Sequence, residues 1–209
     1  MNLTIGQFRD YLERFLEDSQ ITTIERVIDA TNSALNALVA YEPKMASVQF
    51  VGDGSTASFP LPDDYYWYQG LFNGDGNRIN ILWPSNTDYL MPVGENIALI
   101  TPSGNITFIP SLQTGEMITL YYYARWARVT SETDTIEPPY HWLAALTYYA
   151  SAELIISDAL TAAGVRQYNT RIDSGNPEQN PVQRQVESFR KMFREEVNRH
   201  ARITIRNDG

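Results

Sequence analysis

The 209-residue sequence predicts an α+β protein in which N- and C-terminal helices form a helical bundle with an inserted antiparallel β-sheet or small sandwich domain. Two observations support this prediction. Apolar residues recur at helical spacing at the start and over the last third of the chain, whereas the middle consists of short β-branched and aromatic runs separated by turn sequences. We therefore divide the chain into residues 1–45, 46–130 and 131–209.

The first part predicts two helices. Thr4 can cap the first helix, with Gln7 three residues later completing a capping box. The second helix opens at Thr22 or Thr23 and ends shortly before Pro43, because the residue that precedes a proline is driven out of the helical region. We expect both helices to pack with the helices from the other end of the chain.

The middle part predicts six or seven short strands, joined mostly by hairpins. The turn Asn73-Gly74-Asp75-Gly76-Asn77 carries the strongest hairpin signal, and Pro102-Ser103-Gly104-Asn105 carries a second one. Consecutive hairpins favour antiparallel over parallel pairing. The predicted strands are residues 48–51, 57–61, 67–72, 78–83, 97–100, 106–109 and 117–126.

The third part predicts a long helix over residues 140–163, a polar loop at 165–180 and a final helix from Pro181. The long helix has little polar surface, and a helix that is apolar on most sides is buried on most sides. It therefore packs against helical and sheet neighbours or faces another subunit. The candidates for subunit packing are Leu143, Ala145, Leu146, Ala152, Leu154 and Ile155.

Charge is segregated along the chain. The net charge is −9, yet residues 181–209 hold seven basic and four acidic side chains. The acidic remainder argues against a general nucleic-acid or anionic-lipid binder. The basic C-terminal part is either a solvated helix face or an arm that docks on an acidic partner.

The sequence shows no constellation for catalysis or cofactor binding. It has no Cys and only two His, His141 and His200, which excludes structural zinc, iron–sulfur clusters, thiol chemistry and disulfides. Both His residues are interpreted as structural because no nucleophile or orienting acid accompanies them at a motif spacing. Phosphate-cradling glycine motifs are absent, and we expect no cofactor, no metal site, no signal peptide and no membrane span.

Three segments together resemble a known family. They are the helical stretch 24–35, the Ala-Ser-Phe-Pro-Leu-Pro-Asp-Asp-Tyr segment 57–65, and the Pro-Pro-Tyr-His-Trp-Leu-Ala-Ala-Leu stretch that opens 138–152. The chain is similar in these segments to the head-to-tail adaptor proteins of tailed bacteriophages, particularly those with short tails. The polar loop 165–180 has no fixed counterpart in that family.

The resemblance implies a structural virion protein, assembled in the host cytoplasm and located at the head–tail interface. It implies a homo-oligomeric ring, usually of twelve copies, beneath the portal protein, through which double-stranded DNA passes without specific binding. The β domain would face a tail or nozzle protein, with Trp67, Tyr68, Asn73 and Asp75 as candidates. The portal-docking candidates are Arg190, Arg194, Arg199, Arg202, Ile203, Ile205 and Arg206.

Two other function classes remain open. A carbohydrate-binding or host-attachment module would use aromatic side chains gathered on one sheet face beside carboxylates. A hydrolase would need raised carboxyl pKa values in a deep pocket, with Asp63, Asp64, Asp75 or Glu116 as candidates. The adaptor interpretation instead expects that a bulky residue at Ala145 or Ala152 blocks ring formation and leaves the fold intact.

Overall fold

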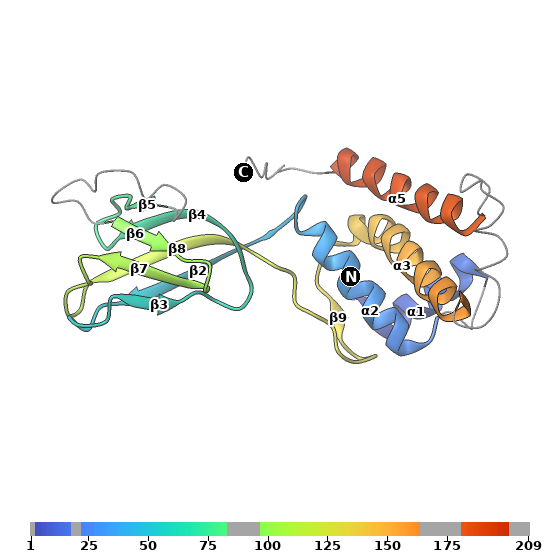
Figure 1. Ribbon diagram of the computed structural model, residues 1–209, viewed down its shortest axis with the longest axis horizontal. Coiled ribbons are helices and arrows are strands. Elements are labelled where there is room, and N and C mark those ends of the chain that lie inside the picture. The colour runs from blue at the N-terminus through green and yellow to red at the C-terminus, as the bar shows by residue number, and fades with distance from the viewer. Residues whose placement is uncertain (1–2, 18–21, 83–96, 164–180, 201–209) are drawn as a thin grey trace. The chain divides into compact units, whose positions relative to one another are not determined.

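The computed structural model describes residues 3–17, 22–82, 97–163 and 181–200, and the chain separates into two compact units (Figure 1). The helical unit comprises residues 1–43 and 126–209, and the β unit comprises residues 44–125. The fold is mixed α+β, which confirms the predicted class.

In the helical unit, the long helix α3 lies between α2 and α5 (Figure 1). The core of the helical unit combines Phe8 and Leu12 of α1 and Leu38 of α2 with Leu154 of α3 and Val197 of α5. All of these side chains have almost no exposed surface. The elements of this unit are β1 (Leu3–Thr4), α1 (Ile5–Leu16), α2 (Ile24–Leu38), β9 (Thr135–Ile136), the 3-10 turn η2 (Tyr140–Trp142), α3 (Leu143–Ala163) and α5 (Pro181–His200).

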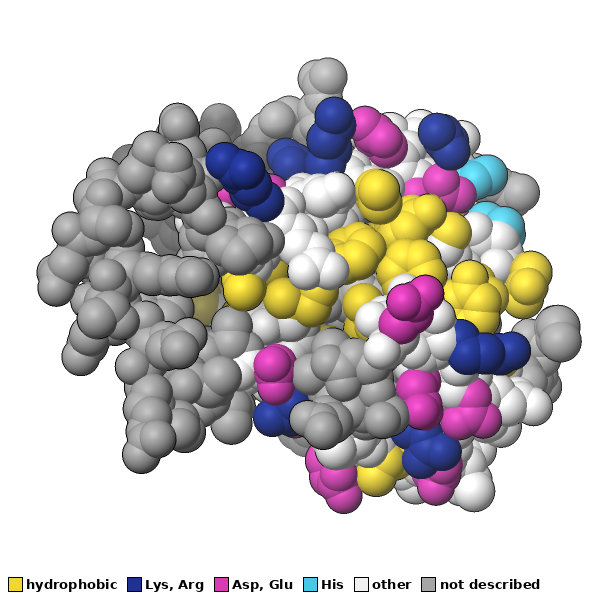
Figure 2. Space-filling view, turned by 90° about the vertical axis from the view of Figure 1, so that its right-hand side faces the viewer, with side chains coloured by type: hydrophobic (Ala, Val, Ile, Leu, Met, Phe, Trp, Pro, Cys, Tyr) yellow, Lys and Arg dark blue, Asp and Glu magenta, His cyan; other side chains and the backbone are white. Residues whose placement is uncertain are grey.

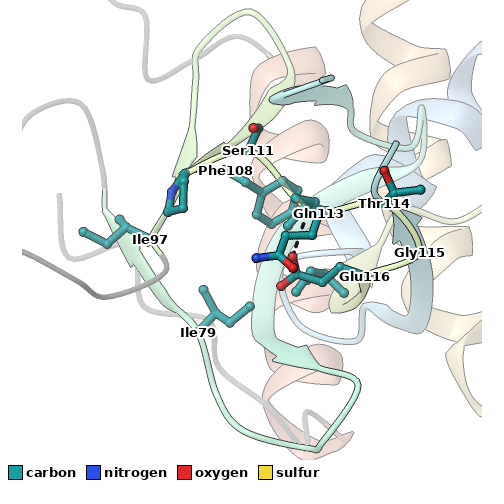
Figure 3. A pocket seen from close by; sticks show the side chains of 11 residues that line it. Ile79, Ile97, Phe108, Ser111, Gln113, Thr114, Gly115 and Glu116 are labelled. Carbon is teal, nitrogen blue, oxygen red and sulfur yellow. Dashed lines mark hydrogen bonds between the residues drawn. The ribbon is translucent and has the colours of Figure 1, made fainter. Parts of the chain in front are cut away.

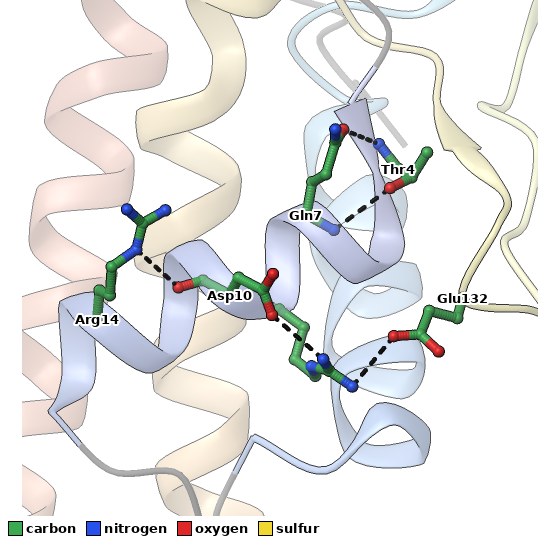
Figure 4. A network of polar contacts seen from close by, with 6 residues as sticks. Thr4, Gln7, Asp10, Arg14 and Glu132 are labelled. Carbon is green, nitrogen blue, oxygen red and sulfur yellow. Dashed lines mark hydrogen bonds and ion pairs between the residues drawn. The ribbon is translucent and has the colours of Figure 1, made fainter.

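The start of α1 confirms the predicted capping box (Figure 4). The backbone N–H of Gln7 donates to the Thr4 hydroxyl at 3.3 Å, and the backbone N–H of Thr4 donates to the Gln7 side-chain oxygen at 3.1 Å. The N–H of Ile5 donates to the Asp134 carbonyl at 2.9 Å. These bonds satisfy donors that the first turn of a helix leaves without intrahelical partners.

Asp134 also stabilises the turn at residues 130–134, which contacts the start of α1. Its carboxylate accepts hydrogen bonds from the backbone N–H groups of Thr130 and Ser131 at 2.6 and 3.0 Å and from the Ser131 hydroxyl at 2.6 Å. These bonds, led by that from the Ser131 hydroxyl, favour the charged form and lower the Asp134 pKa from 3.8 to about 2. Two distant segments, β1 and β9, are thereby fixed side by side.

The boundary between the units differs from the sequence prediction, which put residues 126–130 in the β domain. The Trp126 indole N–H donates to the Glu42 carbonyl at 2.9 Å. The side-chain amide of Asn32 on α2 makes two 2.9 Å hydrogen bonds, one to the N–H and one to the carbonyl of Val129. These residues therefore belong to the helical unit, and the last long strand ends at Ala124 rather than Trp126.

The described residues of the β unit form two sheets, whose strand orders are β2-β8-β4 and β3-β7-β6-β5. Both sheets contribute to one hydrophobic core, for example Phe50, Leu71 and Leu120 from the first and Ile106 and Phe108 from the second. The strands are β2 (Lys44–Val51), β3 (Ser58–Pro60), β4 (Tyr65–Asn73), β5 (Asn80–Leu82), β6 (Ile97–Ile100), β7 (Asn105–Ile109) and β8 (Met117–Ala124).

One predicted hairpin is only partly formed. The turn after Asn73 closes, since the Asn73 N–H donates to the Asn77 carbonyl at 2.9 Å, but only one bridge, Phe72 to Arg78, follows it. Strand β5 does not continue the pairing with β4. It pairs in parallel with β6 in the other sheet. Burial explains the difference, because Ile79 contributes to the core between both sheets. The predicted hairpin of β6 and β7 is confirmed.

The Asp134 hydrogen bonds predict acid-sensitive stability. Because the folded-state pKa lies below the ordinary value, the stabilisation is present above pH 3.8 and is lost as the pH falls towards about 2. We expect Asp134→Asn to lower the melting temperature at neutral pH and to show a smaller further decrease across this acid range. Melting curves measured against pH test this, with Asp75→Asn as a control for one exposed charge. Equal acid dependence of Asp134→Asn and the unsubstituted protein would contradict it.

Candidate functional site

The exposed cations of α5 lie outside the helical core. Arg190 forms an ion pair with Glu153 of α3 at 3.4 Å, and Arg199 pairs with Glu196 at 3.2 Å. The guanidinium of Arg194 donates to the Arg190 carbonyl at 3.3 Å. Exposed pairs of this kind contribute little to stability. The portal-docking candidates Arg202, Ile203, Ile205 and Arg206 lie outside the described residues.

The α3 candidates for subunit packing lie mostly inside the subunit's own core. Ala145, Leu146, Ala152 and Leu154 have at most 2 % of their surface exposed. Leu143 and Ile155 are half-buried and pack against the same core. This burial argues against the expectation that a bulky residue at Ala145 or Ala152 leaves the fold intact, because both side chains have 0 % exposed surface.

A different surface of the helical unit is apolar and accessible. Phe15 of α1 is 40 % exposed, and its ring lies 6.1 Å from that of Tyr148 on α3 and 5.8 Å from that of Phe189 on α5. Tyr11, one turn before Phe15, and Met192, three residues after Phe189, are also exposed. Figure 2 shows hydrophobic side chains gathered on one face of the helical unit, with charged side chains around them.

We call Tyr11, Phe15, Tyr148, Phe189 and Met192 the aromatic patch. Aromatic residues and Met are enriched at protein–protein interfaces, so this composition fits a contact with another protein. Sequence reasoning did not find this patch, because its members come from three helices that are far apart in the chain. The one available signal was Phe15, a large apolar residue two positions before the polar sequence Glu17-Asp18.

The tail-facing candidates of the β unit differ in what they contact. The rings of Trp67 and Tyr68 lie 6.3 Å apart, and Tyr68, which is opposite Tyr122 of β8, also packs against the core. Asn73 shapes its turn, since its side-chain oxygen accepts hydrogen bonds from the N–H groups of Asp75 and Asn77 at 3.1 and 2.8 Å. The Tyr68 ring packs against the core, and the Asn73 side chain is hydrogen-bonded within its turn. Trp67 and Asp75 therefore remain as surface candidates.

A cavity of about 480 Å³ opens in the β unit (Figure 3). Its lining includes Ile79, Phe108 and Ile118 together with the polar residues Gln113 and Glu116. The Glu116 carboxylate accepts a 2.8 Å hydrogen bond from the backbone N–H of Gln113 and so closes the turn before β8. We interpret Glu116 as a structural residue of this turn.

Two of the hydrolase candidates, Asp64 and Glu116, lie at opposite ends of β8. Asp64 accepts a hydrogen bond from the Tyr122 hydroxyl at 2.9 Å, near the end of β8, whereas Glu116 precedes its start. Six residues of strand separate Tyr122 from Glu116, roughly 20 Å. Burial, with the hydrogen bond and charge of Asp64 adding to it, raises the pKa of Tyr122 to about 12. The phenol therefore donates a hydrogen bond at neutral pH and does not act as a base.

The two His side chains lie together at the end of the helical core. The rings of His141 and His200 are 5.7 Å apart, and Trp142 meets His200 edge to face at 5.8 Å. The His200 Nε2 atom lies 3.2 Å from Glu196 Oε1. These contacts attach the start of α3 to the end of α5, consistent with a structural role.

The described part of the chain offers no group of three His, Asp or Glu side chains that could hold a metal ion. Within the same residues, no helix is long and apolar enough to cross a bilayer. Comparison of the sequence with protein-family models gives no match, and comparison with curated proteins gives none.

The burial of Ala152 predicts a stability effect. Ala152 has 0 % exposed surface, so Ala152→Leu adds carbon atoms to a filled core and should lower the free energy of unfolding by about 1–3 kcal/mol. Ala144→Leu is the matched control, because Ala144 lies on the same helix and is half-exposed. Urea unfolding measures both. Equal stability of the two variants would contradict this prediction.

Proposed function

We propose that this chain is a structural virion subunit, a head-to-tail adaptor that forms a ring under the portal of a tailed bacteriophage. The ring would extend the DNA channel and provide the platform to which a tail or nozzle protein attaches. In this proposal the helical unit is a bundle that joins neighbouring copies, and the β unit is a small sandwich inserted into it that faces the tail.

The aromatic patch is the observation that carries the proposal. A soluble domain that worked alone would gain by covering Phe15, which is 40 % exposed beside two further aromatic rings. Such patches, surrounded by polar residues, mark contact sites. In a ring, Phe15 and Met192 would be covered by the neighbouring copy, which replaces the subunit-packing role first predicted for Ala145 and Ala152.

The distribution of charge also supports an adaptor. Residues 181–200 hold five basic and three acidic side chains, whereas residues 1–180 carry a net charge of −12. A channel with an acidic surface does not bind phosphates, so DNA can slide through it. Arg190, Arg194 and Arg199 on α5 provide guanidinium groups suited to carboxylates of a portal protein.

Native mass spectrometry of the full chain, alone and mixed with the portal ring encoded by the same genome, tests the proposal. We expect a complex that contains equal numbers of adaptor and portal chains. A chain that stays apart from the portal under all conditions in which the portal ring is intact would refute the proposal.

A variant of the aromatic patch sharpens this test. Phe15→Asp places a charge in the proposed subunit contact, where an unpaired buried charge is strongly unfavourable. We expect at least a tenfold loss of adaptor bound to portal rings, about 1.4 kcal/mol or more, with the fold retained in circular dichroism. Tyr140→Asp is the control, because Tyr140 is more exposed, at 59 %, and lies outside the patch. Equal binding of both variants would exclude the patch as a ring contact.

The carbohydrate-binding alternative is favoured by one observation on the β unit. Tyr121 of β8 is 44 % exposed, and its ring meets Phe72 edge to face at 5.8 Å, on the same face as Tyr123. Aromatic faces of this kind can stack on sugar rings. A glycan array on which Tyr121→Ser loses binding, while Phe15→Asp keeps it, would favour this function over the adaptor.

A further inference from the structure

The described sheet edges of the β unit differ in how well they are protected against pairing with another chain. Exposed edges invite such pairing, and proteins commonly protect them with short strands, Pro or bulges. Strands β3 and β5 have three residues each, and β3 ends at Pro60. Strand β4 has register shifts between Tyr65 and Trp67 and between Tyr68 and Gly70.

Strand β2 has none of these devices. It pairs with β8 over eight residues in an unbroken register, from Lys44 opposite Ala124 to Val51 opposite Met117. It contains no Pro, and its single charged residue is Lys44 at its start. Among the described edges, β2 is therefore the long and regular one, and its backbone geometry suits pairing with a further strand.

The sheet face beside this edge is uncharged and partly apolar. Exposed fractions are 60 % for Met45, 53 % for Val51, 46 % for Met117 and 44 % for Tyr121. These side chains share one face, because alternate residues of a strand point to the same side. The positions of β2 and β8 on this face are Met45, Ser47, Gln49, Val51, Met117, Thr119, Tyr121 and Tyr123.

We propose that the β2 strands of two copies of this chain pair antiparallel about Val48, and so join two three-stranded sheets into one six-stranded sheet. In this register Val48 lies opposite Val48 of the second copy. Residues 45–51 of one copy then lie opposite residues 51–45 of the other. A shift of the centre by half a residue would turn one copy over, so the uncharged faces stay on the same side only in registers centred on a residue. Pairing about Ser47 would join as many residues but would set Met45 opposite Gln49, whereas pairing about Val48 sets Met45 opposite Val51.

A second copy is the fitting partner because β2 is complementary to itself. On the outer face Met45 meets Val51 and Ser47 meets Gln49, so apolar side chains meet apolar ones and polar side chains meet polar ones. The strand's ends carry opposite charges, Lys44 at the start and Asp53 just beyond Val51. Antiparallel pairing brings Lys44 of one copy near Asp53 of the other.

This contact does not rest on the adaptor proposal. A closed ring of more than two copies joins unlike surfaces head to tail, whereas the β2 contact joins two identical surfaces. It therefore describes the free chain, and it covers the β2 edge before any ring assembles. Seven paired residues bury less area than a standard interface of about 800 Å² per partner, so dimerisation should depend on concentration.

Two double variants at the same positions test the contact. In Ser47→Lys/Gln49→Lys, each lysine lies opposite a lysine of the second copy, and in Ser47→Glu/Gln49→Lys each glutamate lies opposite a lysine. Both sites are exposed, so the fold should persist in either variant. Like charges directly opposite each other are unfavourable and opposite charges favourable. Over two such pairs we expect roughly tenfold weaker dimerisation of the lysine variant and unchanged or tighter dimerisation of the other.

Sedimentation equilibrium over micromolar to submillimolar concentrations measures all three proteins. Added salt should strengthen dimerisation of the lysine variant and weaken that of the glutamate–lysine variant, because it screens both interactions. A monomer throughout this range for the unsubstituted chain overturns the proposal. Equal dimerisation of both variants overturns it as well, because a dimer would then form through another surface. Neither result bears on binding to the portal.

Discussion

The covering of α3 is the constraint on which the helical unit depends. This helix has apolar side chains on most sides, so water cannot be its neighbour over most of its length. Helices from both ends of the chain are needed to cover it, and α2 and α5 supply most of that contact. Ion pairs of Arg26 with Asp158 and of Arg190 with Glu153 reach α3 from these two neighbours. The β unit, residues 44–125, lies in the sequence between the two segments that make up the helical unit.

The polar side chains with the most hydrogen bonds stabilise the fold, since their partners are backbone and hydroxyl groups of nearby segments. Asp134 holds the segment on which α1 begins, and Asn32 ties the chain's return from the β unit to α2. Both replace water at backbone groups that would otherwise lack partners. Asp53 does the same in the β unit, since the hydroxyl and N–H groups of Thr56 and Ser55 surround its carboxylate and hold its pKa far below the usual range.

Among the described residues, the aromatic patch and the sheet face beside the β2 edge are two accessible apolar surfaces, and they suggest two kinds of association. The aromatic patch of the helical unit is formed by three helices and has no internal symmetry, which suits contact with a different surface of a neighbour. The outer face of β2 has an apolar residue near each end and polar residues between them, which suits pairing with the same strand of a second copy. Interfaces of these two kinds lead to rings and to two-fold dimers respectively.

Local patterns were sufficient to predict the α+β class, the capping box at Thr4, the hairpin of β6 and β7 and the start of α5 at Pro181, because each depends on residues within a few positions of one another. The structure alone shows that β5 pairs in parallel with β6, that residues 126–130 join the helical unit, and that Ala152 is fully buried. It also brings Phe15, Tyr148 and Phe189 into one surface. These features depend on which distant segments bury one another, and that choice minimises exposed apolar surface over the whole unit.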